Sequence, residues 1–192
     1  MKQRFINLLQ KTKRPGVDNL IGYLETKTDF FTAPASAKYH GAKEGGLLEH
    51  SLVVYDELER SLEWYGIECS AESAVIIALL HDVCKTNFYK KVIKNQKDGY
   101  LPNGKPNWVE VEGYEIEDQF PLGHGEKSVI LLQRYIWLFD DEIMAIRWHM
   151  GAWDDAARGY AGSLQLAAAM QKYPLITALH TADMIANNIK HI

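Results

Sequence analysis

The chain has 192 residues, which is long enough for one domain with a substantial core. Hydrophobic residues make up 47% and charged residues 24%, values typical of a soluble globular protein and unlike those of a disordered chain. A formal net charge of −4 gives no overall attraction to nucleic acids or anionic membranes, so any affinity for phosphate has to be local.

No targeting or membrane-spanning segment is expected. The N-terminal stretch MKQRFINLLQKTKRPG is basic, but its apolar part is too short for a signal peptide. The longest apolar run, AVIIALL, is too short to cross a bilayer. Cys69 and Cys84 lack CxxC spacing, which predicts neither a zinc knuckle nor a disulfide framework. These features together predict a cytoplasmic protein without a membrane partner.

Most of the chain is predicted to be helical. Apolar residues recur at helical spacing over residues 17–25, 46–65, 71–83, 126–139, 140–150, 163–173 and 174–189. Ser70 is a suitable N-cap, Pro174 suits the first turn of the last helix, and Asp140 or Asp141 could cap the helix that carries His149. With no internal repeat and no dividing linker, residues 1–192 are expected to form a single domain.

Residues 98–118 break this helical pattern. Asn103-Gly104 is a turn signal, and WVEV and YEIE alternate as short strands do. We therefore expect a β-hairpin inserted between helices, serving either as a lid over a site or as a structural elaboration. The preceding run KTNFYKKVIKNQK carries five lysines, which we interpret as a solvated helix face. A surface that tracks the phosphates of a single nucleic acid strand is the alternative.

The helix at 71–83 ends in ALLHDVCK, where an apolar run meets three ionisable residues. Burying Asp82 without a partner would cost several kcal/mol. A basic side chain, a proton or a metal ion must therefore neutralise it.

Histidines interrupt several apolar helical segments. Five of the seven histidines do so: His50, His81, His124, His149 and His180. A single histidine on an apolar face is usually a hydrogen-bonded core residue. Several of them on separate helices, accompanied by Asp82 and Asp183, are typical of a transition-metal site built inside a bundle.

The order His50, then His81-Asp82, then Asp183 resembles the signature of the HD-domain metal-dependent phosphohydrolase superfamily. That signature is a histidine, a histidine-aspartate pair and a distal aspartate, all on helices. The stretch HGAKEGGLLEH also resembles the first motif of HD proteins related to 3′-to-5′ exoribonucleases. The resemblance covers most of the chain and implies an all-α HD-type helical bundle.

The resemblance also implies one or two divalent transition metal ions, drawn from Mn, Fe, Ni, Co, Zn or Mg. One ion would be held by His50, His81, Asp82 and Asp183, and the other by Asp82, His124 and His149, with Asp82 as the bridge. Adjacent helical residues point about 100° apart, and a bridging Asp82 allows His81 to serve one ion alone.

Two further residues take roles from the resemblance. Lys85 would contact the substrate phosphate and act with Asp82 in catalysis, a solvated lysine at a helix end being the alternative reading. His40 would approach the substrate. Cys84 stands where the superfamily often has glycine, and Met150 stands where a second histidine often follows, which argues for two metals at most. His180 could orient a ligand, whereas Arg147 is expected to point away from the site.

The predicted activity is hydrolysis of a phosphoester, with a nucleotide or a nucleic acid end as substrate. The first alternative is a di-iron oxygenase, because some proteins of similar fold use nearly the same ligands. The second is a non-catalytic protein that binds nucleotides or acts as a scaffold. The sequence leaves the metal, the sugar and base of the substrate, and the oligomeric state open.

Overall fold

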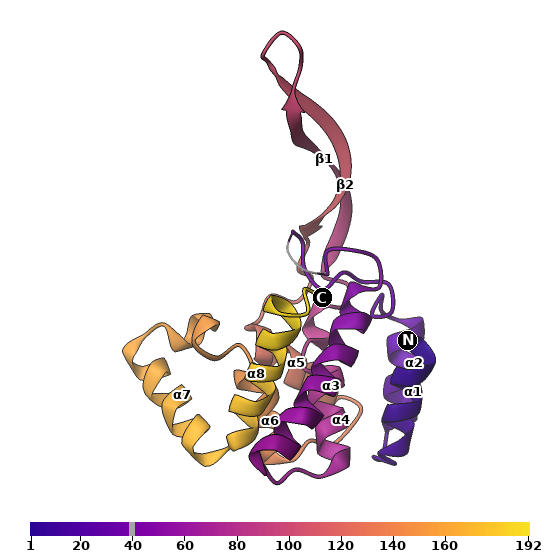
Figure 1. The fold of residues 1–192 in the computed structure, drawn as a ribbon. Coiled ribbons are helices and arrows are strands. Elements are labelled where there is room, and N and C mark those ends of the chain that lie inside the picture. Colours follow the sequence, from indigo (N-terminus) through magenta and orange to yellow (C-terminus); the bar gives the residue numbers. More distant parts are fainter. Residues whose placement is uncertain (39–40) are drawn as a thin grey trace.

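A computed structural model describes residues 1–38 and 41–192. Within them, the chain forms a helical bundle with one two-stranded antiparallel sheet, which confirms the expected fold class (Figure 1). The α-helices are α1 (Lys2–Lys11), α2 (Val17–Thr26), α3 (Gly46–Tyr65), α4 (Ala71–Leu80), α5 (His124–Gln133), α6 (Asp140–Trp148), α7 (Tyr160–Lys172) and α8 (Pro174–Asn188). Short 3-10 turns lie at Val83–Lys85, Gly151–Trp153 and Asp155–Ala157.

Helix α4 runs through the core of the bundle. Every side chain from Ser73 to Leu80 is buried, as expected for a helix that is apolar on all sides. The Ser70 hydroxyl accepts a hydrogen bond from the Ser73 N–H at 3.0 Å, which confirms the predicted N-cap. Because α4 ends at Leu80 inside the bundle, the next two residues, His81 and Asp82, are delivered to its interior.

The other helices are arranged so that the site residues meet. Helix α3 packs against α4 and α8, and α6 packs against α5 and α8 (Figure 1). Helix α8 begins at Pro174, as predicted. The predicted cap of α6 is wrong, since Phe139 is its N-cap and Asp140 is its first residue. Glu142 accepts a hydrogen bond from the Phe139 N–H at 2.9 Å, and this contact fixes the start of the helix.

The N-terminal segment forms a helix that the apolar pattern did not predict. Helix α1 buries only Phe5 and Leu9, too few residues to give a clear periodic signal. Arg14, in the loop after α1, donates to the Trp137 carbonyl at 2.6 Å and forms an ion pair with Glu142 at 2.7 Å. The N-terminal helices are thereby joined to the loop before α6.

The inserted hairpin is longer and begins earlier than predicted. It consists of β1 (Tyr89–Tyr100) and β2 (Pro106–Ile116), paired from Tyr89–Ile116 to Lys97–Trp108, rather than residues 98–118. The interpretation of the lysine-rich run as a helix face is wrong, because most of that run is strand β1. Cross-strand pairs such as Lys90–Glu115 stabilise β1, and a helical reading of a short window cannot detect them.

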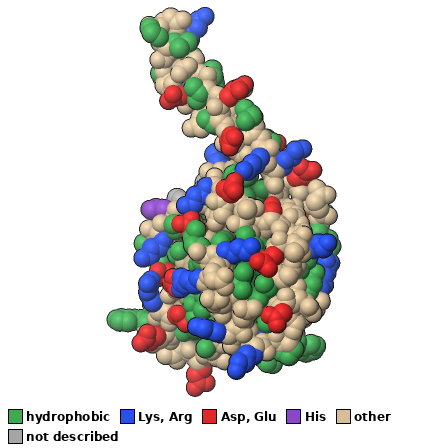
Figure 2. Space-filling model, turned by 90° about the vertical axis from the view of Figure 1, so that its right-hand side faces the viewer, with side chains coloured by type: hydrophobic (Ala, Val, Ile, Leu, Met, Phe, Trp, Pro, Cys, Tyr) green, Lys and Arg blue, Asp and Glu red, His purple; other side chains and the backbone are tan. Residues whose placement is uncertain are grey.

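The hairpin projects away from the helical body as an arm (Figure 1). Apolar side chains are exposed along it, among them Ile93, Tyr100 and Trp108, and charged groups of both signs lie between them (Figure 2). In the part of the chain that the structure describes, no helix has the length and apolar character needed to cross a bilayer.

Candidate metal centre

Asp82 lies at the centre of a cluster of buried ionisable side chains, and its two carboxylate oxygens face different partners. Oδ2 is 2.6 Å from Lys85 Nζ, 3.4 Å from His81 Nε2 and 3.6 Å from His50 Nε2. Oδ1 is 2.8 Å from His124 Nε2 and 3.5 Å from His149 Nε2. Both oxygens of one carboxylate therefore face imidazoles, an arrangement that would suit a bridge between two cations.

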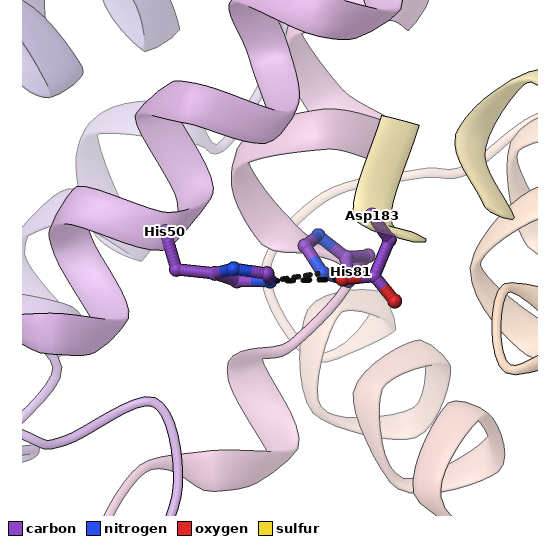
Figure 3. A group of neighbouring side chains, drawn as sticks. All are labelled: His50, His81 and Asp183. Carbon is purple, nitrogen blue, oxygen red and sulfur yellow. Dashed lines mark hydrogen bonds and ion pairs between the residues drawn. The ribbon is translucent and has the colours of Figure 1, made fainter. Parts of the chain in front are cut away.

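His50, His81 and Asp183 form the first group of neighbouring ligand atoms. They come from α3, from the end of α4 and from α8, and their side chains point toward one another (Figure 3). His50 Nε2 is 3.1 Å from Asp183 Oδ1 and 3.4 Å from His81 Nε2. All three ligand atoms lie within 4.8 Å of one another, close enough to surround a single ion.

A second group contains His81, Asp82 and His149, with ligand atoms again within 4.8 Å of one another. His124, the first residue of α5, approaches Asp82 from the same side as His149, the C-cap of α6. The structure thus brings together all six residues predicted to bind metal: His50, His81, Asp82, His124, His149 and Asp183. Their role as metal ligands stays a prediction.

Two of the imidazoles are oriented by backbone carbonyls. His81 Nδ1 is 2.9 Å from the Ala78 oxygen, and His149 Nδ1 is 2.7 Å from the Ile146 oxygen. Because a carbonyl oxygen only accepts, each Nδ1 donates this hydrogen bond, and in the neutral imidazole each Nε2 presents its lone pair to the cluster. This is the orientation that a metal-binding histidine needs.

The His149 ring supplies the clearest evidence that a metal would fit. Its Nε2 atom is buried and has no hydrogen-bond partner among the described residues. A buried polar atom without a partner is costly in a folded protein, and a divalent cation would satisfy it. The donor set of imidazole nitrogens and carboxylate oxygens suits transition metals such as Mn, Fe, Co, Ni and Zn.

Both aspartates of the cluster are charged at neutral pH. Burial by itself raises the pKa of Asp82, but Lys85, His81 and the other imidazoles hold that pKa well below its usual value. Burial also raises the pKa of Asp183, and its hydrogen bond with His50 more than offsets this and lowers the pKa. In contrast, burial lowers the pKa of His124, which favours the neutral imidazole that binds metal.

Cys84 lies beside the cluster, and its Sγ forms with ligand atoms of Asp82 and His124 a third group within 4.8 Å of one another. Its Sγ is 4.0 Å from Asp82 Oδ1, and burial together with the Asp82 charge raises the pKa of the thiol to about 12. The Cys84 N–H donates to the Ser128 hydroxyl at 3.2 Å. Cys84 therefore replaces the glycine common in the superfamily with a packed, protonated thiol.

A cavity of about 330 Å³ opens onto the cluster. Asp82, Lys85, His124 and Asp183 form its polar end, and its other lining residues include Met150, Trp153, His180 and Asn187. The Lys85 side chain remains 17% exposed while its ammonium contacts Asp82, so it can reach a ligand in this cavity. His40, which was predicted to approach the substrate, lies outside the described residues.

Residues next to the cluster include one that the sequence analysis did not identify and one whose contact it did not specify. Asn187 donates to Asp183 Oδ1 at 2.8 Å, and its i+4 spacing from Asp183 was a signal that could have identified it. His180 Nδ1 is 2.6 Å from the His149 carbonyl, so His180 supports the chain next to that histidine. Arg147 bridges Glu126 and Asp154, and none of the cluster residues is among these partners.

Comparison with known proteins identifies the class. The family model "HD domain" matches residues 47–188, so the chain belongs to the HD domain family and to its superfamily of metal-dependent phosphohydrolases. The chain is also similar to dihydroneopterin 2′,3′-cyclic phosphate phosphodiesterase of Methanocaldococcus jannaschii, with 33% identity over 101 residues. That similarity covers 47% of this chain and only 37% of the archaeal protein. No solved structure gives a significant match.

Proposed function

We propose that this protein is a metal-dependent phosphohydrolase that cleaves a phosphoester of a small, nucleotide-like molecule. The observation that carries the proposal is the Asp82 carboxylate, which faces His50 and His81 with one oxygen and His124 and His149 with the other. Such a carboxylate suits two cations that act together on one phosphate.

In the proposed hydrolysis, the metal ions, Lys85 and the imidazoles have different roles. When bound, divalent metal ions supply Lewis acidity, which lowers the pKa of water and offsets phosphoryl charge. Lys85 Nζ, now 2.6 Å from Asp82 Oδ2, would turn to a phosphoryl oxygen and stabilise the charge that develops there. Water adds to phosphorus, the ester P–O bond breaks, and the departing oxygen takes up a proton. The imidazoles fixed by backbone carbonyls keep this arrangement rigid.

The archaeal relative widens the set of substrates to be tested. Its name describes cleavage of a 2′,3′-cyclic phosphate, a phosphodiester within a small molecule. We therefore include cyclic phosphodiesters with phosphomonoesters among the candidate substrates. A nucleic acid end, considered from the sequence, receives no support from the lysine-rich strand β1, because the arm that carries it projects away from the helical body (Figure 1).

The test is phosphoester turnover by protein loaded separately with each candidate metal. Metal-stripped protein would be reconstituted with Mn, Fe, Co, Ni, Zn or Mg and assayed on nucleoside monophosphates and 2′,3′-cyclic nucleotides. We expect turnover that depends on metal and is lost on chelation. Oxygen consumption with iron, without phosphoester cleavage, would instead identify an oxygenase. Tight nucleotide binding without any turnover would identify a binding protein.

A further inference from the structure

A second cavity, of about 320 Å³, lies next to the one that opens onto the metal centre. The two cavities share His124, Met150 and Trp153 as lining residues. A ligand with its phosphate at Asp82 and Lys85 therefore has adjoining space for the rest of the molecule. The residues that line the second cavity therefore determine which chemical groups the non-phosphate part of the ligand can carry.

The second cavity is acidic. Glu126, Asp154 and Asp155 line it, and no lysine or arginine of the described chain does. Arg147 pairs with Glu126 Oε1 at 2.5 Å and with Asp154 Oδ2 at 2.7 Å without itself lining the cavity. Arg158 also pairs with Asp155 at 3.1 Å, so three carboxylates face two guanidiniums and the surroundings keep a net negative charge. This charge disfavours a second phosphate and favours a group that donates N–H.

Glu126 offers an acceptor that the protein leaves unused. Its Oε2 atom is buried and has no hydrogen-bond partner in the described residues. Gly123 makes room for this oxygen, since a Cβ on Gly123 would lie only 2.1 Å from it. The Glu126 side chain as a whole is 35% exposed, so a small rotation would present this oxygen to a ligand N–H in the cavity, which would satisfy it.

Trp153 supplies an aromatic face on the border between the two cavities. It is 67% exposed, and it lies on the 3-10 turn Gly151–Trp153, outside the buried core. Exposure alone does not mark a site, because Trp64 and Trp137 are even more exposed and line neither cavity. The position of Trp153 beside the phosphate end distinguishes it, since indole rings stack well on planar heterocycles.

We propose that the second cavity binds the organic part of the substrate, a planar heterocycle that stacks on Trp153 and donates N–H to Glu126. This inference rests on the proposed function, and it narrows the substrate to a phosphoester with one phosphate and an amino-bearing ring. A guanine-type ring has the required donors. A nucleic acid strand is disfavoured, because its next phosphate would meet the acidic lining.

The test measures binding apart from turnover. The probes are phosphonate analogues of guanosine 5′-monophosphate and of ribose 5-phosphate, in which a CH₂ group replaces the ester oxygen and prevents hydrolysis. Titration calorimetry with metal-loaded protein should show tighter binding of the guanosine analogue. Trp153→Ala should weaken that binding about tenfold or more and leave the ribose analogue unaffected. Trp153→Phe should restore most of the affinity, and Trp64→Ala, the matched control, should change neither affinity.

Equal affinity of the wild-type protein for the two analogues, or equal loss of both in Trp153→Ala, would overturn the inference. A Glu126→Gln variant adds a second test, since it should reduce the preference for the guanosine analogue over an analogue with unsubstituted purine. No reduction would exclude Glu126 as the acceptor. Phosphoester turnover that does not depend on Trp153 would leave the proposed function intact and reject this cavity as the ring site. Selective binding that depends on Trp153, without any turnover, would support the ring site and reject hydrolysis.

Discussion

Lys85 is the counter-charge that the protein itself provides for Asp82. Lys85 Nζ is 2.6 Å from Asp82 Oδ2. Burial lowers the pKa of the Lys85 ammonium, but the negative charge of Asp82 more than offsets this, so the pKa is raised overall. Metal ions bound to Asp82 would weaken its hold on Lys85. The freed ammonium could then bind the phosphate, which links metal binding to substrate binding.

Replacing Lys85 with methionine tests this role at the scale of one residue. Lys85→Met keeps the length of the side chain and removes its charge, so kcat/KM for phosphoester hydrolysis should fall about a hundredfold or more. Metal content should stay unchanged, because Lys85 is not a ligand. Steady-state kinetics and elemental analysis measure the two quantities. The matched control is Lys90→Met on the exposed arm, and equal kcat/KM in both variants would refute the role of Lys85.

The family resemblance predicted the ionisable members of the cluster and their division around a bridging Asp82, but not the atomic contacts that produce this division. The residue types and their order along the chain were enough to assemble His50, His81, Asp82, His124, His149 and Asp183 as one set. Which oxygen of Asp82 faces which imidazole depends on the packing of α3, α5, α6 and α8, and no local pattern contains that information. Trp153 was overlooked for the same reason, because only the fold places it beside the cavity.

Among the elements, the start of α6 is held by a buried ion pair. Arg14 and Glu142 are both buried, and their contact joins the loop after α1 to the helix that leads to His149. Arg14 also donates to the Trp137 carbonyl and pairs with Glu72, at the start of α4. Breaking this network would therefore disturb two helices that supply the metal centre.

A Glu142→Gln variant should lower the free energy of unfolding of the metal-stripped protein by about 2 kcal/mol or more, because it removes the fully buried charged partner of Arg14 and leaves only the partly exposed Glu72. Denaturant unfolding followed by circular dichroism measures the change. Glu44→Gln serves as the control, since Glu44 pairs with Lys91 on the exposed surface and its loss should have no measurable effect. Equal stability of the two variants would show that the buried pair contributes little.

The helices were easier to predict than the hairpin, for a physical reason. The segments 46–65 and 71–83 carry apolar residues over several turns; the observed α3 spans the first, and α4 begins as predicted but ends at Leu80. Strand β1 instead depends on its pairing with β2, up to 27 residues along the chain in the pair Tyr89–Ile116. Its lysines lie on an exposed arm, so burial imposes no clear alternation on the sequence.

At the scale of the whole molecule, the arm and the helical body are separate features. No hairpin residue from Tyr89 to Ile116 lines either cavity beside the metal centre, and the arm points away from the body (Figure 1). The hairpin is therefore a poor candidate for a lid. Its exposed Ile93 and Trp108 are surface features of the arm rather than parts of the site.

Shortening the arm tests this separation. Asn95 pairs with Glu110, so joining these two residues through an Asn-Gly turn removes the distal hairpin and keeps its base. We expect kcat, KM and metal content for a small phosphoester to stay within about twofold of the wild-type values, because the cavities are untouched. A severalfold rise in KM would instead show that the arm closes over the substrate.

Asp82→Asn tests most directly whether one carboxylate serves two metal ions. The amide has the same size but lacks the charge and the second strong donor that bridging requires. Elemental analysis and phosphate release would be measured on wild-type protein, on the variant and on the surface control Asp56→Asn, each loaded with the most active metal. We predict that Asp82→Asn loses at least one metal equivalent and nearly all turnover, while Asp56→Asn retains both. Full metal occupancy with undiminished hydrolysis in Asp82→Asn would contradict the bridging role.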